Sequence, residues 1–435
     1  MPALNKILQT APDALTLLQI FSFCDPENIP ISILKQGCCD LYQESMRDVP
    51  VASAGNELEA IIELFRSSTR LAKAIREIQR QSLAVYTLEG SERIIRIHDL
   101  VQLLLRSKLI DAAEREQWLE MVICIVCKAF DGIDDPDSPR NWGRCHQFIS
   151  HIEFMEGFAA QYGLLNSTLL DASTRAATYV NACGLYQKAA NMCKRTWDQR
   201  KALLGEEHLD TLASMANLAL TYQNQGRWTE AEKLGIRVSE TRQRVLGEEH
   251  PKTLISIGNL ASTYQNQGRW TEAEKLEIRV SETRQRVLGE EHPDTLSSMG
   301  NLASTYQHQE RWEEAEKLEM RVLETRQRVL GEEHPKTLID MNNLASTYYE
   351  QGRWKEAEKL GIRALKTSQR VLGKEHPHTL VSMINLAFTW KAQGRNAKAI
   401  NLLEQCVHLR GQILGVDHPS TVASSAALTK WQRKS

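Results

Sequence analysis

The sequence has no long apolar run, no excess of one charge and no regular spacing of its cysteines. Its longest apolar stretch, around Met121 to Ala129, is too short to span a bilayer, and no signal-peptide pattern opens the chain. The 53 basic residues nearly balance the 55 acidic ones, so nucleic acid is not expected as a partner. The nine cysteines, including the adjacent Cys38 and Cys39, suit reduced thiols. We therefore expect a cytoplasmic protein that does not span a membrane.

Motifs that carry chemistry are also missing. No Gly-x-x-x-x-Gly-Lys-Ser/Thr phosphate loop occurs, and no Ser-His-Asp or Cys-His set stands out from the background. Cys124 and Cys127 have a spacing seen in zinc and redox sites, but they lie in an apolar run without a second pair, which favours buried core. We expect no enzyme activity, no metal site and no cofactor.

What the sequence does have is a repeat. A Leu-Gly pair recurs every 42 residues, at Leu204, Leu246, Leu288, Leu330, Leu372 and Leu414. Within each unit two helical patterns flank a Gly-Arg turn, for example at Gly226, and a Gly-Glu-Glu-His-Pro loop joins the units. One such hairpin cannot bury its apolar face alone, so the units must stack. The period predicts a mainly α fold, a right-handed superhelix of 42-residue helical hairpins with a concave surface.

These residues carry a family resemblance. Asn-Leu-Ala-x-x-Tyr-x-x-Gln-Gly-Arg-Trp followed by Leu-Gly-x-x-His-Pro resembles the 42-residue tetratricopeptide (TPR) repeat of kinesin light chains. Five regular units and a degenerate unit before them place the array at 169–420. A helix from about Thr421 to Trp431, within 421–435, is expected to cap its open end.

The N-terminal third has a different pattern. An apolar helix and a Cys-Asp-Pro-Glu-Asn-Ile-Pro turn precede two strand-like segments, 83–87 and 93–97, around a Glu-Gly-Ser-Glu turn. His98 then opens an apolar helix. Helices followed by a hairpin suggest a small winged-helix-like domain over 1–110, joined to the repeats by a helical linker over 111–168. DNA binding is disfavoured, because little positive charge follows Asp99.

Two motifs here, Asp-Pro-Glu-Asn-Ile-Pro and Ile97 to Gln102, resemble the winged-helix end of the nucleotide-binding NB-ARC module in fungal NOD-like (NLR-like) receptors. The resemblance implies that His98 and Asp99 belong to a motif that senses bound ADP. It also implies an NB-ARC module as a partner in cis or in trans. Without a phosphate loop, this chain alone is not expected to hydrolyse ATP. The alternative function is part of a STAND-type nucleotide switch whose phosphate loop lies outside this chain.

The candidate binding site is a ladder of asparagines in the first helix of every unit. A carboxamide offers two donors and an acceptor, which suits gripping the backbone of an extended peptide regardless of its sequence. In kinesin light chains such asparagines hold cargo peptides, and the resemblance implies the same role here. The alternative is that they bond the backbone of the adjacent repeat. With their polar neighbours, the predicted groove residues are Asn217, Asn259, Asn301, Asn343, Asn385, Ser262, Ser304, Ser346, Asn224, Asn266 and His308.

Two further sets of repeated residues have structural interpretations. One histidine per inter-repeat loop could suggest metal, but stacked repeats lie on the order of 10 Å apart, too far for a shared ion. These histidines are His208, His250, His292, His334, His376 and His418. Paired arginines end the second helices, and we expect solvated side chains balanced by nearby glutamates rather than a site for acidic partners. These arginines are Arg242, Arg244, Arg284, Arg286, Arg326 and Arg328.

Overall fold

The structure is a computed structural model that describes residues 6–7, 9–46, 56–89, 92–136 and 138–433. It divides into two compact units. The first unit comprises Met1–Ala182 with Asn191–Gly205, and the second comprises Cys183–Ala190 with Glu206–Ser435. Over these described ranges, no helix is both long enough and apolar enough to cross a bilayer.

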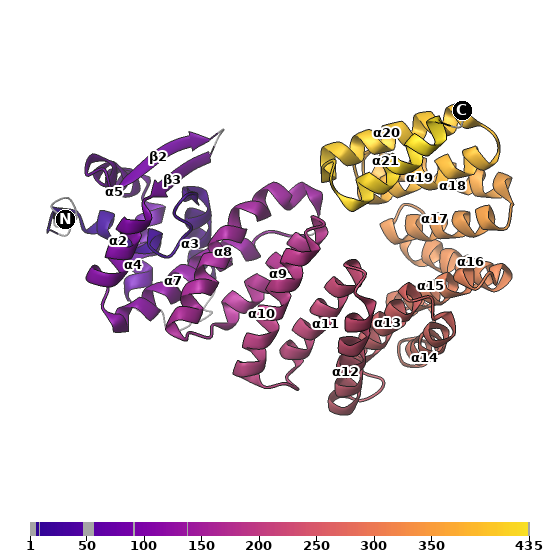
Figure 1. Cartoon of the computed structure of the whole chain (residues 1–435), viewed down its shortest axis with the longest axis horizontal. Helices are drawn as coiled ribbons and strands as arrows, with labels where there is room; N and C mark the ends of the chain where they lie inside the picture. The colour runs from indigo at the N-terminus through magenta and orange to yellow at the C-terminus, as the bar shows by residue number, and fades with distance from the viewer. Residues whose placement is uncertain (1–5, 8, 47–55, 90–91, 137, 434–435) are drawn as a thin grey trace. The chain divides into compact units, whose positions relative to one another are not determined.

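The first unit combines helices with a small antiparallel sheet of order β1-β3-β2 (Figure 1). The predicted hairpin is confirmed, with Tyr86 opposite Ile95; residues 90 and 91 of its turn lie outside the described residues. A strand that we did not predict, β1, pairs with β3 and comes from the Asn-Ile-Pro of the turn. The elements up to this point are α2 (Pro12–Phe21), β1 (Ile29–Pro30), α3 (Ile31–Ser45), α4 (Asn56–Arg66), α5 (Ser68–Arg80), β2 (Ala84–Glu89) and β3 (Glu92–Ile97).

The helices after the hairpin pack into the same core. Gly37 of α3 lies against the backbone of Ile125 in α7, so closely that no Cβ would fit between the two helices. Cys127 of α7 is buried, as predicted, and burial raises the pKa of its thiol; Cys124 is half-buried. The predicted boundary at 110 therefore falls inside one compact unit. The remaining helices are α6 (Asp99–Leu104), the π-helix η1 (Leu105–Leu109), α7 (Ala112–Asp131), η2 (Pro139–Asn141), α8 (Trp142–Tyr162), α9 (Ser167–Ala182) and α10 (Tyr186–Leu204). The first residues of α10, up to Ala190, belong to the second unit.

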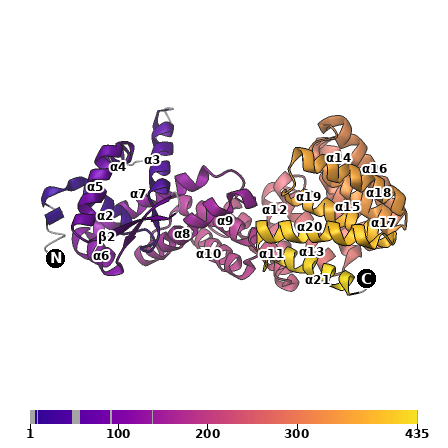
Figure 2. The same cartoon turned by 90° about the horizontal axis from the view of Figure 1, so that it is seen from above.

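The second unit is a stack of helical hairpins, which confirms the predicted α-solenoid. The first helix of each hairpin, as in α13, α15 and α17, lies on the inner side of a curved array. The second helices, such as α14 and α16, lie on the outer side (Figure 1). Helices α20 and α21 run side by side (Figure 2). The helices are α11 (Leu209–Asn224), α12 (Trp228–Leu246), α13 (Pro251–Asn266), α14 (Trp270–Leu288), α15 (Pro293–His308), α16 (Trp312–Leu330), α17 (Pro335–Glu350), α18 (Trp354–Val371), α19 (Pro377–Ala392), α20 (Asn396–Leu414) and α21 (Pro419–Gln432).

The turn inside each hairpin needs a left-handed residue. Gly226 has φ of +73°, and the N–H of Arg227 closes the turn on the carbonyl of Tyr222 at 2.9 Å. The same turn in the third hairpin has Glu310 in place of glycine, with φ of +59°. A side chain in this conformation costs free energy because its Cβ crowds the following carbonyl.

Replacing Glu310 by glycine is therefore expected to stabilise the array. The change Glu310→Gly should raise the free energy of unfolding by about 0.5–1 kcal/mol, the balance of relieved strain and added chain entropy. Urea unfolding followed by circular dichroism measures it. The reciprocal change Gly268→Glu, in the second hairpin, should lower stability by a similar amount. Equal midpoints for parent and Glu310→Gly would contradict the argument.

The loop histidines are helix caps. In each loop Nδ1 accepts the backbone N–H two residues later, for example from Lys252 to His250 at 3.1 Å, while a proline often follows at the first helical position. This satisfies one of the free N–H groups at the helix start. The histidines with this role are His208, His250, His292, His334, His376 and His418.

The arginine pairs divide into two kinds. The second arginine of each pair in the sequence is exposed and forms an ion pair with a glutamate of the preceding inter-repeat loop, as predicted. Arg286 and Glu249, for example, are 2.7 Å apart. The expectation of solvated side chains is wrong for the first arginine of each pair. Arg242 and Arg326 are each only 5% exposed, and Arg284 is half-buried. These guanidiniums lie between a second helix and the next first helix, where Arg326 pairs with the buried Asp340 at 2.7 Å.

Candidate binding groove

A pocket of about 240 Å³ lies between α13 and α15, with α14 also contributing to its wall. Three of the predicted groove residues line it: Asn259 and Ser262 from α13, and Asn301 from α15. Glu277 and Arg284 line it from α14. The pocket is therefore built from two successive repeats, and it lies on the surface that carries the predicted asparagine ladder.

The ladder side chains are available for binding. Asn217, Asn259 and Asn385 are half-buried, while Asn301 and Asn343 are exposed. Within the part of the chain that the structure describes, none of the five carboxamides forms a hydrogen bond. The bonds that the alternative interpretation requires, from these amides to the backbone of an adjacent repeat, are thus not formed there.

A different residue joins adjacent repeats. The side-chain amide of Gln223 donates to the carbonyl oxygen of Asn259 at 3.0 Å and to the hydroxyl of Thr263. Gln265 donates to Thr305 at 2.6 Å and Gln307 to Thr347 at 2.5 Å in the following repeats. From α11 to α17, these glutamine–threonine bonds join each first helix to the next, and the ladder asparagines beside them are left without side-chain bonds.

Two buried carboxyls belong to this glutamine–threonine network. Glu277 accepts from Gln265 at 2.9 Å and from the hydroxyl of Thr305, and it is only 3% exposed. Glu319 accepts from Gln307 at 2.9 Å in the next repeat. Burial disfavours the charged form and raises the pKa of each carboxyl to about 7, although the threonine hydroxyl opposes the shift. The pocket wall thus contains an acid that titrates near neutral pH.

The pocket is open because α13 has a glycine there. A Cβ at Gly258 would meet no heavy atom within 4 Å, and the same is true of Gly300 one repeat later. At the equivalent place in α17, Asn342 is buried and donates to Ser382 at 2.8 Å. In α19 Ile384 packs into the core there. Open space beside the ladder is therefore found at Gly258 and Gly300, in the second and third regular repeats.

The remaining predicted groove residues lie apart from this pocket. Ser304 and Ser346 occupy the position of Ser262 on α15 and α17. Asn224, Asn266 and His308 are exposed at the ends of their helices and do not line the pocket. His308 instead stacks on Trp270, with ring centroids 4.5 Å apart and planes inclined by 11°.

The predicted nucleotide-sensor motif lies in the first unit. His98 caps α6, because its Nδ1 accepts the N–H of Leu100 at 3.1 Å, and Asp99 begins the helix. The N–H of Ile97 donates to the carbonyl of Pro26 at 2.9 Å, which brings the two resembling motifs together. Gln102 of the second motif donates to the carbonyl of Phe21, at the end of α2 and before the first motif. Among the described residues, no three His, Cys, Asp or Glu side chains are placed to hold a metal ion.

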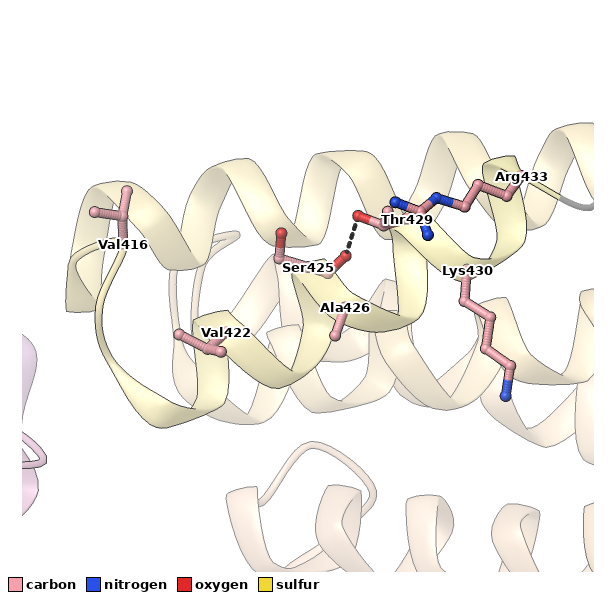
Figure 3. A pocket seen from close by; sticks show the side chains of 7 residues that line it. All are labelled: Val416, Val422, Ser425, Ala426, Thr429, Lys430 and Arg433. Carbon is pink, nitrogen blue, oxygen red and sulfur yellow. Dashed lines mark hydrogen bonds between the residues drawn. The ribbon is translucent and has the colours of Figure 1, made fainter.

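A wider depression of about 580 Å³ lies on the last helix, and Figure 3 shows its lining. Val422, Ser425 and Thr429 face outward from α21, and the hydroxyl of Thr429 is bonded to the carbonyl of Ser425 at 2.9 Å. Ser425 stands where the internal repeats have buried Met or Ile, such as Ile257. The outer face of α21 is thus partly polar, as a capping helix requires, while Val422 on the same face is 51% exposed.

The comparisons with known proteins agree with the geometry. Residues 212–277, 253–328, 300–361 and 339–412 match the tetratricopeptide repeat model, so 212–412 belong to the tetratricopeptide repeat family. Similar solved structures include nearly identical TPR-like repeats from Podosopora anserina that are named as a kinesin light chain. They are 33% identical, with 47% of this chain and 98% of that chain covered and a TM-score of 0.40. This part of the chain is therefore similar in sequence to repeats named as those of a kinesin light chain.

Two further structures are similar at lower identity. BtubC (BKLC) from P. vanneervenii is 22% identical, with 53% of this chain and 92% of that chain covered and a TM-score of 0.44. A STAND protein with a tetratricopeptide repeat sensor from Pyrococcus horikoshii is 14% identical, with a TM-score of 0.44; the match covers 98% of this chain and 61% of that one. A search of the curated proteins found no match.

Proposed function

We propose that this chain is a non-catalytic scaffold whose repeat groove binds an extended peptide or a protein segment. The observation that carries the proposal is the ladder of asparagine amides without hydrogen bonds beside a pocket held open by Gly258. Free amides at a regular spacing can pair with a peptide backbone, while the pocket accepts a ligand side chain. Because the Gln223-type bonds already hold the repeats together, binding need not disturb the fold.

Filling the pocket tests the proposal. A peptide selected on the full chain from a displayed random library should lose at least about tenfold in affinity for Gly258→Ile, because the isoleucine occupies the ligand's space. Isoleucine is the residue of the fifth regular repeat at this place, Ile384, so the helix tolerates it. Lys275→Ala, an exposed change on α14, is the control and should leave affinity unchanged. Unaltered binding to a folded Gly258→Ile variant would count against the groove.

We further propose that the scaffold is the sensing or effector-binding half of an NLR-like assembly in the cytosol. This rests on the two motifs that resemble the NB-ARC winged helix and on the bond that joins them, from the N–H of Ile97 to the carbonyl of Pro26. The alternative is a part of a STAND-type switch. An open reading frame just upstream that encodes the phosphate loop would decide for the switch.

A further inference from the structure

In the first unit, the start of α6 presents apolar side chains to solvent. Leu100 and Leu103 are 60% and 53% exposed, and Phe154 of α8 is 38% exposed. Together they line an open depression of about 590 Å³ with the turn that follows α2. Spaced by three residues, the two leucines lie on one face of their helix. Exposed apolar side chains gathered on one surface mark a place for a partner.

Carboxylates surround this apolar strip. Asp25, Glu27 and Asp99 line the same depression, and none forms an ion pair with another described residue. Its cation, Arg106, is already engaged: it donates to the carbonyl of Ser22 and lies 4.4 Å from the ring centre of Phe158. Burial lowers the pKa of Arg106. With three carboxylates against the one guanidinium of Arg106, the side chains that line the depression carry a net negative charge.

The backbone around the depression is held in place by buried bonds. Gln102 donates to the carbonyls of Phe21 and Cys24 at 2.8 and 2.9 Å, which fixes α6 against the end of α2. The N–H of Asp25 donates to Nδ1 of the buried His151 at 3.1 Å. A surface that is already ordered loses little conformational entropy when a partner docks.

We propose that the α6 surface, made of Asp25, Glu27, Asp99, Leu100, Leu103 and Phe154, docks an amphipathic helix of another protein. The apolar stripe of that helix would cover Leu100, Leu103 and Phe154, as helices pack ridge into groove. Lysine or arginine beside the stripe would pair with the three carboxylates, which sets orientation and excludes acidic partners. The partner is thus a basic amphipathic helix, and the inference stands independently of the repeat groove.

A synthetic helix of about 18 residues tests the surface, with leucine at helical spacing, lysine on both flanks and a fluorescent label. The full chain should bind it with an affinity that falls as salt is added, and a twin peptide with glutamate for lysine should not bind. Leu100→Ser/Leu103→Ser should weaken binding by about tenfold or more. Glu27→Gln/Asp99→Asn should weaken binding and flatten its salt dependence.

The hairpin strand supplies a matched control. Val85 and Leu88 of β2 are 61% and 67% exposed, so Val85→Ser/Leu88→Ser removes a similar apolar area and should leave binding unchanged. The proposal would be overturned if this control lost as much affinity for the lysine peptide as Leu100→Ser/Leu103→Ser does. It would also be overturned if the glutamate peptide bound as tightly as the lysine peptide. If Leu100→Ser/Leu103→Ser fails to fold by circular dichroism, the charge variant decides. Self-association of the chain that is abolished by the α6 changes would also overturn it, since a second copy would then cover the surface.

Discussion

At pH 8 the Glu277→Gln/Glu319→Gln double variant is expected to unfold at a higher temperature than the parent protein. The pKa of each buried carboxyl is raised from 4.5 to about 7. Between these values the folded state holds a proton that the unfolded state has lost, so stability falls as pH rises from about 4.5 to about 7 and is then constant. Each site should cost up to about 3 kcal/mol above pH 7, and glutamine, which is always neutral, removes that cost.

Thermal melts at pH 5 and pH 8 make the comparison, and the difference between variant and parent at each pH isolates the two sites. Near pH 5 the difference should be much smaller than at pH 8, because only a minor part of the pH-dependent loss of stability has then occurred. Glu274 is a control on the same helix, since bonds from Gln309 and Arg311 overcome burial and lower its pKa. Glu274→Gln should therefore destabilise the protein at pH 8. If the double variant loses as much stability between pH 5 and pH 8 as the parent does, the pH dependence does not come from Glu277 and Glu319.

These two glutamates show where inference from sequence stopped. The string Glu274-Lys275-Leu276-Glu277 has the composition of a solvated helix face, and it gives no sign that one acid is buried. Each second helix of the solenoid packs against the first helix of its own repeat and that of the next, so more of its circumference is covered than one apolar stripe indicates. The burial of Arg242 and Arg326 has the same cause.

The array itself could be predicted because its signals are local and recur at a fixed spacing. Glycine at the turn, as in Gly226, and His-Pro at each helix start act within a few residues, and the 42-residue period repeats them in register. The cap made by the imidazole of His250 was not foreseen, although its position was. In the first unit β1 was missed, because two residues are too few to show an alternating pattern.

The asparagine ladder could likewise be predicted, but its surroundings could not. Asn259 and Asn301 share a position in the repeat, and the carboxamide is suited to a peptide backbone. The opening between them depends on Gly258, which as a single glycine inside a helical pattern would ordinarily suggest only lower helix propensity. Whether space remains there depends on what neighbouring helices place against it, and that is a property of packing.

Removing the ladder is expected to abolish groove binding without unfolding the protein. If the amides bond a bound peptide's backbone, one Asn→Ala change should weaken binding by about 0.5–1.5 kcal/mol, the net contribution of a hydrogen bond. The triple change at Asn259, Asn301 and Asn343 should largely eliminate it. The melting temperature should barely move, because these carboxamides form no hydrogen bond within the described chain. Titration of the selected peptide, beside thermal melts, measures both quantities.

The glutamines that join the repeats provide the opposite control. Changing Gln223, Gln265 and Gln307 together to alanine removes the bonds to Thr263, Thr305 and Thr347 and should lower the melting temperature clearly. Peptide affinity of the fraction that remains folded should change far less than in the asparagine triple variant. The two triple variants thus separate adhesion between repeats from ligand binding. An asparagine triple variant that is destabilised yet binds with unchanged intrinsic affinity would show that other side chains of the groove hold the ligand.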